Sequence, residues 1–176
     1  MTKVNFAEAR QKAEEAGLMG GGPFKPRAGD NRFRLVSECL EHPGEFKDPA
    51  TGKVKPTFKW LCFILNRANK QVVPYFMPNV VYEAIEKLQL NPDYAFDEVP
   101  MPYDLTLNVV NPGKMDVVYT VLPARQNTEL TVEEVALVKE AGSIKDYQNE
   151  VRKAQALKES GEHQEPTIQV EPAQAA

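Results

Sequence analysis

The sequence contains few of the side chains that usually build catalytic and metal-binding sites. Its 176 residues include two cysteines, two histidines and one tryptophan. Two cysteines are too few for the disulfide framework of a small secreted protein and are typical of a reducing compartment. No apolar run approaches the ~18–20 residues of a membrane-spanning helix, and residues 1–17 are charged where a signal peptide would be apolar. These absences predict a cytoplasmic protein that does not span a membrane, in the host cytoplasm if the protein is viral.

Motifs of the common enzyme classes are absent as well. The sequence has no GxxxxGK[ST] phosphate loop, no HExxH, no CxxC and no GxSxG. Nucleophilic catalysis would depend on His42, because His163 lies close to the C-terminus in a polar segment. Cys39 and His42 have the spacing of metal ligands and Cys62 could be a third, but a structural zinc site needs four. We therefore predict no catalytic site, no bound metal and no cofactor.

Charge is distributed unevenly along the chain. The formal net charge is −4, and 42% of the residues are hydrophobic, as in a globular domain. Residues 23–70 contain ten lysines and arginines against five acidic residues, a balance of +5. Residues 128–176 contain ten acidic residues against five basic ones, a balance of −5. A basic segment and an acidic end suggest two different binding roles, and scattered solvated charge is the simpler alternative.

Hydrophobic periodicity divides the chain into a β-rich middle and helical ends. Alternating or continuous apolar runs predict five strands, at 31–36, 57–67, 71–76, 103–110 and 116–122. Turn residues predict a long loop at 42–56 between the first two strands. Helices are predicted at about 5–16, at 79–88 with Asn79 as the N-cap, and, after capping boxes that begin at Thr131 and Ser143, at 131–142 and 143–160.

The order of these elements predicts a mainly β fold with added helices. Three strands, a helix and two further strands follow one another as in an OB-fold, a five-stranded Greek-key barrel that binds oligonucleotides. We expect an N-terminal helix and flexible arm at 1–22, the OB-fold domain at 23–127, C-terminal helices at 128–160 and a disordered acidic tail at 161–176. Element order is an analogy of fold and does not itself establish function.

The predicted strand at 57–67 combines cations with aromatic side chains. Lys59, Phe63 and Arg67 alternate onto one face of this strand, and Trp60 lies on the other face. Cations on a sheet face can pair with phosphates, and an aromatic ring between them can stack on a base for about 1–3 kcal/mol. The alternative is that Phe63 and Trp60 are part of the hydrophobic core. The strand therefore predicts a face that binds single-stranded nucleic acid.

Five segments match a known pattern when they are taken in order. They are GDNRFRL at 29–35, KWLCFILNR at 59–67, VVPYFMPNVVYEAIEKL at 72–88, YDLTLNVVNPG at 103–113 and DVVYTVLP at 116–123. Their order and spacing resemble those of bacteriophage single-stranded DNA-binding proteins of the OB-fold type. The matching positions are Gly29, Arg32, Arg34, Trp60, Arg67, Tyr103, Asp104, Tyr119 and Pro123. The resemblance covers about residues 29–142 and implies a role in phage DNA replication and recombination.

These observations lead to one expected function and two alternatives. We expect a protein that coats single-stranded DNA without strong sequence preference, its cations holding phosphates and its aromatic rings stacking on bases. The residues expected at this interface are Lys25, Arg27, Arg32, Arg34, Lys59, Trp60, Phe63, Arg67, Lys70 and Tyr75. Replication or recombination proteins are expected to bind the tail at 161–176. The alternatives are a non-catalytic protein-interaction module, and a metal-dependent nuclease that uses Asp93, Asp97, Glu98, Asp104 and Asp116.

Overall fold

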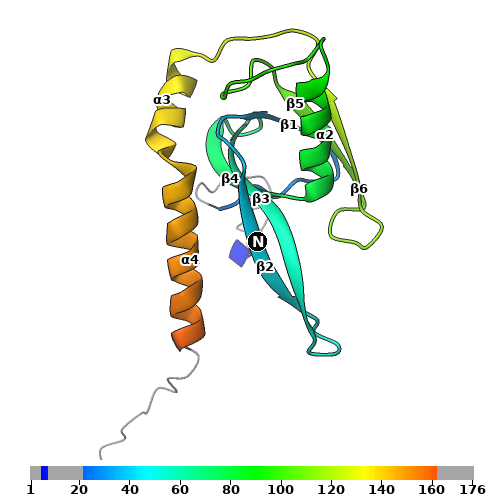
Figure 1. The fold of residues 1–176 in the computed structure, drawn as a ribbon, viewed down its shortest axis with the longest axis vertical. Coiled ribbons are helices and arrows are strands. Elements are labelled where there is room, and N and C mark those ends of the chain that lie inside the picture. Colours follow the sequence, from blue (N-terminus) through cyan, green and yellow to red (C-terminus); the bar gives the residue numbers. More distant parts are fainter. Residues whose placement is uncertain (1–4, 8–21, 162–176) are drawn as a thin grey trace, which may run out of the picture. The chain divides into compact units, whose positions relative to one another are not determined.

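The computed structural model describes residues 5–7 and 22–161. Most of the predicted N-terminal helix and nearly all of the predicted acidic tail lie outside the described residues. The chain divides into two compact units, residues 1–144 and residues 145–176. Among the described residues, the first unit contains all the strands and helices α2 and α3, and the second contains most of helix α4 (Figure 1).

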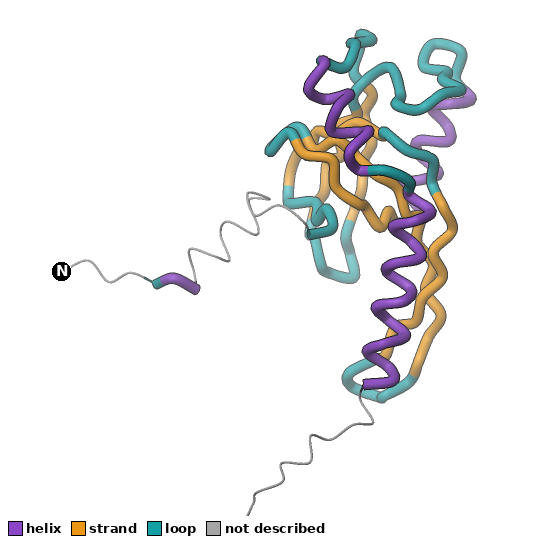
Figure 2. Tube along the Cα trace, turned by 90° about the vertical axis from the view of Figure 1, so that its left-hand side faces the viewer, coloured by secondary structure: helices purple, strands orange, loops and turns teal. Residues whose placement is uncertain are grey.

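Six strands of the first unit form one curled antiparallel sheet (Figure 2). In chain order they are β1 (Gly29–Leu35), β2 (Leu40–Lys47), β3 (Val54–Asn66), β4 (Gln71–Met77), β5 (Leu105–Val110) and β6 (Val118–Pro123). The pairing order is β2-β3-β1-β5-β6, and β4 pairs with β3. The long strand β3 is central because β2, β1 and β4 all pair with it. The expected mainly β fold with added helices is confirmed at this level, as a barrel-like curled sheet.

One strand was not predicted. The expected loop at 42–56 is wrong, because strand β2 runs straight through Pro43 and Gly44 and pairs with the first half of β3. The chain turns only at 48–53, where the Asp48 amide donates to the Lys53 carbonyl over 2.8 Å. A proline lacks a backbone donor, so it fits an edge strand whose outer side has no partner. The paired segments 40–47 and 54–60, named the arm here, extend away from the rest of the sheet (Figure 1).

The hydrophobic core lies between the curled sheet and helix α2 (Asn79–Leu90). The helix contributes the buried side chains of Val81 and Ile85, as its periodicity predicts. Its N-cap is Pro78, so the prediction that Asn79 caps the helix is wrong. The sheet contributes the alternate residues of its strands, among them Phe33, Leu35, Cys62, Ile64, Val73, Tyr75, Met77, Leu105, Leu107 and Val109.

The C-terminal helices begin where their caps predict. Helix α3 (Val132–Ala141) has a complete capping box, in which Thr131 and Glu134 satisfy each other's backbone amides, and it ends at Gly142. None of its own residues is buried. Helix α4 (Ile144–Gly161) is a single element of 18 residues. Within residues 5–7 and 22–161, no helix has an apolar stretch long enough to cross a membrane.

Candidate nucleic-acid interface

The two faces of the arm carry different side chains. Partners in an antiparallel register lie on the same face of the sheet, so the register sorts the arm residues into two sets. One set, the basic face, pairs His42 with Lys59 and Phe46 with Lys55, and it also contains Gly44 and Thr57. Both lysines are exposed, and Phe46 is 54% exposed. None of these six residues is acidic, so the basic face carries two cations and a solvent-facing aromatic ring.

An aromatic pair lies next to this face where the arm joins the sheet. The ring of His42 contacts the ring of Phe76 on β4, with 5.0 Å between the centroids and 60° between the planes. Phe76 is paired in register with Leu61, so it is on the same face as Lys59. The basic face therefore continues from two lysines and Phe46 on the arm to a His–Phe pair at its base.

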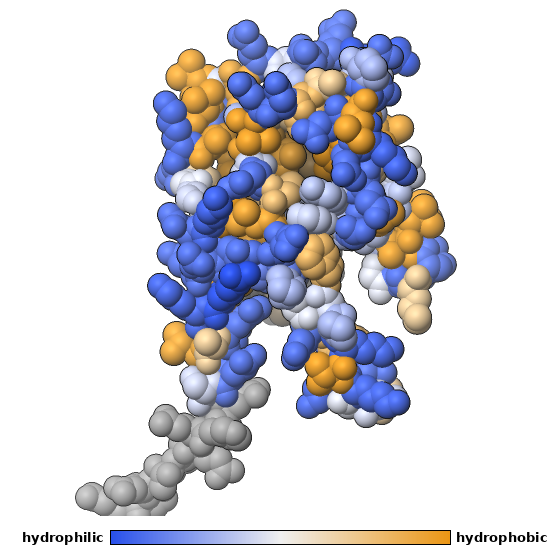
Figure 3. Space-filling model, in the orientation of Figure 1, coloured by the Kyte–Doolittle hydropathy of each residue, from blue (hydrophilic) through white to orange (hydrophobic). Residues whose placement is uncertain are grey.

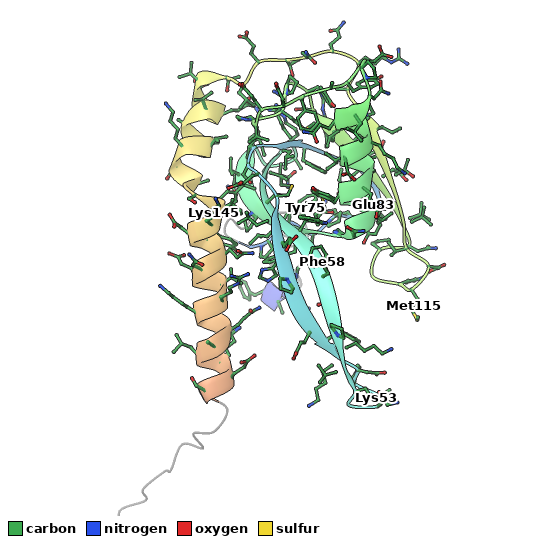
Figure 4. All side chains as sticks on the ribbon, viewed as in Figure 1. Lys53, Phe58, Tyr75, Glu83, Met115 and Lys145 are labelled. Atoms are coloured by element: carbon green, nitrogen blue, oxygen red, sulfur yellow. The ribbon has the colours of Figure 1, made fainter. Side chains whose placement is uncertain are left out.

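The opposite face of the arm, named the aromatic face, has a different composition. Its residues are Glu41, Pro43, Glu45, Lys47, Val54, Pro56, Phe58 and Trp60. Trp60 stacks on Tyr82 of helix α2 with 3.9 Å between ring centroids, and its indole N–H donates to Asn79 Oδ1 over 3.0 Å. Phe58 meets Trp60 edge-on at 5.1 Å. Figure 4 labels Phe58 on the arm and Lys53 at its tip.

This environment argues against Trp60 as a base-stacking residue. One face of its ring is covered by Tyr82. Glu41 is its register partner, and burial, followed by the charges of Cys39, Glu86 and Glu41, raises the pKa of Tyr82. A phosphate approaching this side of the arm would meet negative charge. Trp60 instead fastens the arm to helix α2.

Three of the arginines predicted to bind DNA instead contact one buried carboxylate, that of Asp104. Arg34 Nε lies 2.7 Å from Asp104 Oδ1, Arg32 Nε lies 3.0 Å from Asp104 Oδ2, and Arg67 donates to both oxygens at 3.1 Å. Arg67 also forms an ion pair with Glu134 of helix α3. We name these residues the Asp104 cluster. It joins strands β1 and β3 and the start of β5 to a helix that has no buried residue of its own.

The cluster shifts the pKa values of Asp104 and Arg67. Burial alone would raise the pKa of Asp104, but hydrogen bonds from Arg67 and Arg34 and their charges outweigh it and hold that pKa below its usual range. Burial likewise lowers the pKa of Arg67 less than its carboxylate partners raise it. Removing one partner of a buried ion pair typically costs about 3–5 kcal/mol, because the other charge is left uncompensated. The cluster is therefore a structural joint.

Arg34 and Arg67 were predicted to bind DNA, and the structure places them in this joint. The Arg34 side chain is 1% exposed and also donates to the backbone carbonyl and the hydroxyl of Thr128. The Arg67 side chain is 22% exposed and is bound by two carboxylates. Arg32 retains a side chain that is 60% exposed, despite its contact with Asp104. A buried guanidinium is not available to a phosphate, so the prediction that Arg34 binds DNA is wrong.

Two of the predicted stacking residues are buried. Tyr75 packs edge-on against Phe24 at 5.0 Å and Phe33 at 6.0 Å, and burial raises the pKa of its phenol well above the usual value. Phe63 is 6% exposed, and its amide donates to Ser37 Oγ over 2.7 Å. These rings cannot reach a base without unfolding the sheet. The alternative interpretation of Phe63 as a core residue is the correct one, and Tyr75 belongs to the core as well.

The remaining predicted cations are exposed but dispersed. Lys25 and Arg27 belong to a segment beside β4, where the Phe24 amide donates to the Pro74 carbonyl over 2.7 Å. The Arg27 amide donates to Asn31 Oδ1 over 2.9 Å. Lys70 occupies the turn between β3 and β4, with a φ of 55°. Of the ten predicted residues, only Lys59 lies on the basic face of the arm.

Sequence reasoning missed three residues of this face and one structural hub. Phe46 and His42 fell in the predicted loop, and Lys55 preceded the predicted start of the strand. For Lys55 the signal was the period of two that it shares with Lys59 and Phe63, whereas Phe46 and His42 lie on β2, which local turn residues conceal. Asp104 matched a position of the phage proteins, but neither periodicity nor spacing reveals a charge that is buried by its partners.

The structure offers no site for the metal-dependent alternatives within its described residues. Among the residues that the structure describes, no three or more histidine, cysteine, aspartate or glutamate side chains are grouped so that they could hold a metal ion. Asp104, one of the carboxylates of the nuclease alternative, is paired with three arginines. Cys39 and Cys62 are free thiols.

Comparisons with protein families, with curated proteins and with solved structures give no match.

Proposed function

We propose that this protein binds single-stranded DNA without strong sequence preference, along the basic face of its arm. The observation that carries the proposal is the sorting of charge between the two faces. Lys55 and Lys59 lie on one face with no acidic neighbour in the register, whereas Glu41 and Glu45 lie on the other. The other face also carries Lys47, so its formal charge is −1 against +2 on the basic face. A two-stranded ribbon with this imbalance presents its positive side to a polyanion.

The aromatic residues of the basic face add a second interaction. Phe46 is paired in register with Lys55 and is 54% exposed, so a base can stack on its ring while the lysine holds the adjoining phosphate. Stacking of this kind is worth about 1–3 kcal/mol per base and is tolerant of sequence. Where the arm meets the sheet, half-buried Phe76 packs against the buried ring of His42, so Phe76 is the aromatic side chain of that pair that solvent reaches.

The finer fold assignment is part of the same proposal. We assign the domain as an OB-fold whose first strand is interrupted, so that β1 and β2 are its two halves. The register supports this, because β1 and β2 both pair with β3, while Val36–Cys39 stand opposite only Cys62 and Phe63. Helix α2 between β4 and β5, and the pairing of β1 with β5 and of β5 with β6, are in keeping with that topology.

The resemblance to bacteriophage proteins adds a biological setting. We assign the protein to phage DNA replication or recombination, as a non-enzymatic protein that coats and protects single strands in the host cytoplasm. Replication or recombination proteins are proposed to bind the acidic segment 161–176, which lies almost wholly outside the described residues. A peptide of these sixteen residues that fails to compete in a pulldown of such proteins would contradict that partner assignment.

The central experiment removes both lysines of the basic face. In the Lys55→Ala/Lys59→Ala variant, affinity for oligo-dT should fall, and the slope of log affinity against log salt should become shallower by roughly 1.4, at ~0.7 per phosphate contact. The loss should be similar for oligo-dA, because phosphate contacts carry no base information. Fluorescence anisotropy at several salt concentrations measures both quantities.

A matched control removes the same charge elsewhere. Lys87 and Lys139 are exposed on helices α2 and α3, so Lys87→Ala/Lys139→Ala changes the net charge equally without touching the arm. Its salt slope should remain that of the wild type. Equal losses in the two double variants would contradict the proposed surface and leave only a general effect of net charge.

A second candidate function is favoured by a different surface. Val110 and Val118 are a register pair on the β5–β6 hairpin, and they are exposed together with Leu122 and Met115. Figure 3 shows hydrophobic residues interrupting the hydrophilic surface of this hairpin. Such a surface is typical of a protein-interaction module. That function predicts no salt-dependent affinity for oligo-dT, so the titration above separates the two candidates.

A further inference from the structure

The two cysteines of the sequence face each other across paired strands. Cys39 immediately precedes β2, and continuing the register that pairs Leu40 with Leu61 by one residue brings Cys39 opposite Cys62. The two side chains interact closely enough to shift each other's pKa, and the Cys62 thiol also donates to the Tyr75 carbonyl over 3.8 Å. Directly opposed residues of antiparallel strands have Cα atoms about 4.5–5.5 Å apart, which lies within the range of disulfide-bonded cysteines. The two sulfur atoms can therefore be joined without moving either strand far.

The surrounding backbone can absorb the small adjustment that a bond requires. Between Leu35, paired with Ile64, and Leu40, paired with Leu61, the chain inserts four residues opposite two. Such a bulge interrupts the ladder locally and bends the strand. Cys39 is the last residue of this bulge, so one of the two sulfurs is attached to irregular backbone and the other to the centre of a regular strand.

The two thiols differ in reactivity and access. The interaction with Cys62 lowers the pKa of the Cys39 thiol and outweighs burial and the neighbouring Glu38, which raise it. The same interaction and complete burial raise the pKa of Cys62 well above its usual value. Cys39 is partly exposed and Cys62 is fully buried. An attacking thiolate that is accessible and a resolving thiol beside it are the features of a redox-active pair.

We propose that Cys39 and Cys62 form a reversible intramolecular disulfide when the protein meets a peroxide. The Cys39 thiolate attacks one oxygen of hydrogen peroxide, the O–O bond breaks, and the second oxygen leaves as water after protonation. The sulfenic acid on Cys39 is then attacked by the sulfur of Cys62. The S–S bond forms, the S–O bond breaks, and a second water leaves with the proton of Cys62. Two thiols are oxidised and one peroxide is reduced to two waters.

The bond would connect the bulge at the base of the arm to the central strand. It would restrain the direction in which the arm leaves the sheet, because the bulge is where β1 and β2 are joined. The only tryptophan of the chain lies close enough to report the change. The charge of Cys39 acts on Tyr82, and Tyr82 stacks on Trp60. This proposal is independent of whether the arm binds DNA.

The experiment uses the reduced full-length protein and hydrogen peroxide. After removal of excess peroxide and denaturation in acid, both thiols should be lost and the intact mass should fall by two hydrogens. The product should run as a monomer without reductant. Trp60 fluorescence should change in step with thiol loss, and dithiothreitol should restore both thiols and the original fluorescence.

Two variants identify the roles of the cysteines. Cys39→Ser should leave the thiol of Cys62 unreacted, with no change in fluorescence, because the buried sulfur has lost its partner. Cys62→Ala should leave a sulfenic acid on Cys39 that dimedone traps. Wild-type protein that gains oxygen on Cys39 while Cys62 stays a thiol would overturn the proposal. So would covalent dimers, or two thiols that survive peroxide sufficient to modify Cys39 in Cys62→Ala.

Discussion

The Asp104 cluster and the basic face of the arm both contain cations of the predicted interface, but the cations of the cluster are paired with carboxylates and those of the arm are not. Three arginines form ion pairs with Asp104, and Arg67 also pairs with Glu134. The positive charges are therefore compensated by carboxylates, and the side chains of Arg34 and Asp104 are buried. Lys55 and Lys59 are exposed on a face without carboxylates. A planar guanidinium can bind a carboxylate through two hydrogen bonds, whereas a hydrated ammonium acts as a point charge that can pair with the phosphates of a polyanion. The comparison separates cations that hold the fold together from cations that are free to bind a ligand.

The largest effect should come from removing the carboxylate of the cluster. In Asp104→Ala, Arg34 remains buried without its counter-charge, and the free energy of unfolding should fall by about 3–5 kcal/mol. Urea denaturation followed by circular dichroism measures the loss. The Lys55→Ala/Lys59→Ala variant should unfold within about 0.5 kcal/mol of the wild type, as is usual for surface substitutions. An arm variant as unstable as Asp104→Ala would remove the distinction between the two regions.

A pair of phenylalanine variants sharpens the same comparison on aromatic residues. Phe63→Ala should cost about 3–5 kcal/mol of stability, because the ring is buried. Phe46→Ala should leave the melting temperature nearly unchanged and weaken oligo-dT binding by about 1–3 kcal/mol. Thermal melts and anisotropy titrations of the two variants test whether Phe63→Ala mainly lowers stability and Phe46→Ala mainly lowers affinity. A Phe46 variant with wild-type affinity would exclude that ring from stacking.

The cluster should also give stability a specific dependence on acid. The pKa of Asp104 is depressed in the folded protein, so its contribution is fully present above the pKa of an unfolded aspartate, about 3.9. It is lost as the pH falls from there through the lower folded pKa. Between pH 5 and pH 2 the wild type should therefore lose more stability than Asp104→Asn. Parallel curves for the two proteins would show that Asp104 is not differentially ionised.

The smallest effect is expected on the aromatic face of the arm. Because Trp60 stacks on Tyr82 and has Glu41 as its register partner, added oligo-dT should quench its fluorescence only slightly. Trp60→Phe keeps an aromatic ring and should retain wild-type affinity within a few-fold. Strong quenching of Trp60 fluorescence at saturating oligo-dT would indicate that DNA binds the face that carries Glu41 and Glu45.

Much of the fold was accessible from sequence because its periodicity is strong. The alternation of Leu105, Leu107 and Val109 placed β5 correctly, and Thr131 with Glu134 identified the start of α3. Strand β2 was missed because Pro43 and Gly44 are local turn signals, whereas its formation depends on pairing with residues 54–61. Pairing between distant segments leaves no local pattern, so the arm could not be predicted.

The candidate site was harder to predict than the fold for a related reason. The alternation of β3 correctly grouped Lys59 with Phe63, but it could not show that burial begins between them. Likewise, Arg32 and Arg34 read alike in the sequence, and only the three-dimensional position of Asp104 distinguishes an exposed arginine from a buried one. The alternation of residues in the sequence shows which side chains share a face of a strand. Whether other elements bury that face depends on the tertiary structure.

Pro43 has a consequence for how the protein behaves at high concentration. Within the described residues, β2 pairs only with β3, so its other edge faces outward. A paired strand accommodates proline where its nitrogen points away from the partner, and the missing donor is then on the open edge. An exposed edge that lacks a donor is a poor template for another chain. Pro43 therefore disfavours the addition of a further strand along the β2 edge of the ribbon.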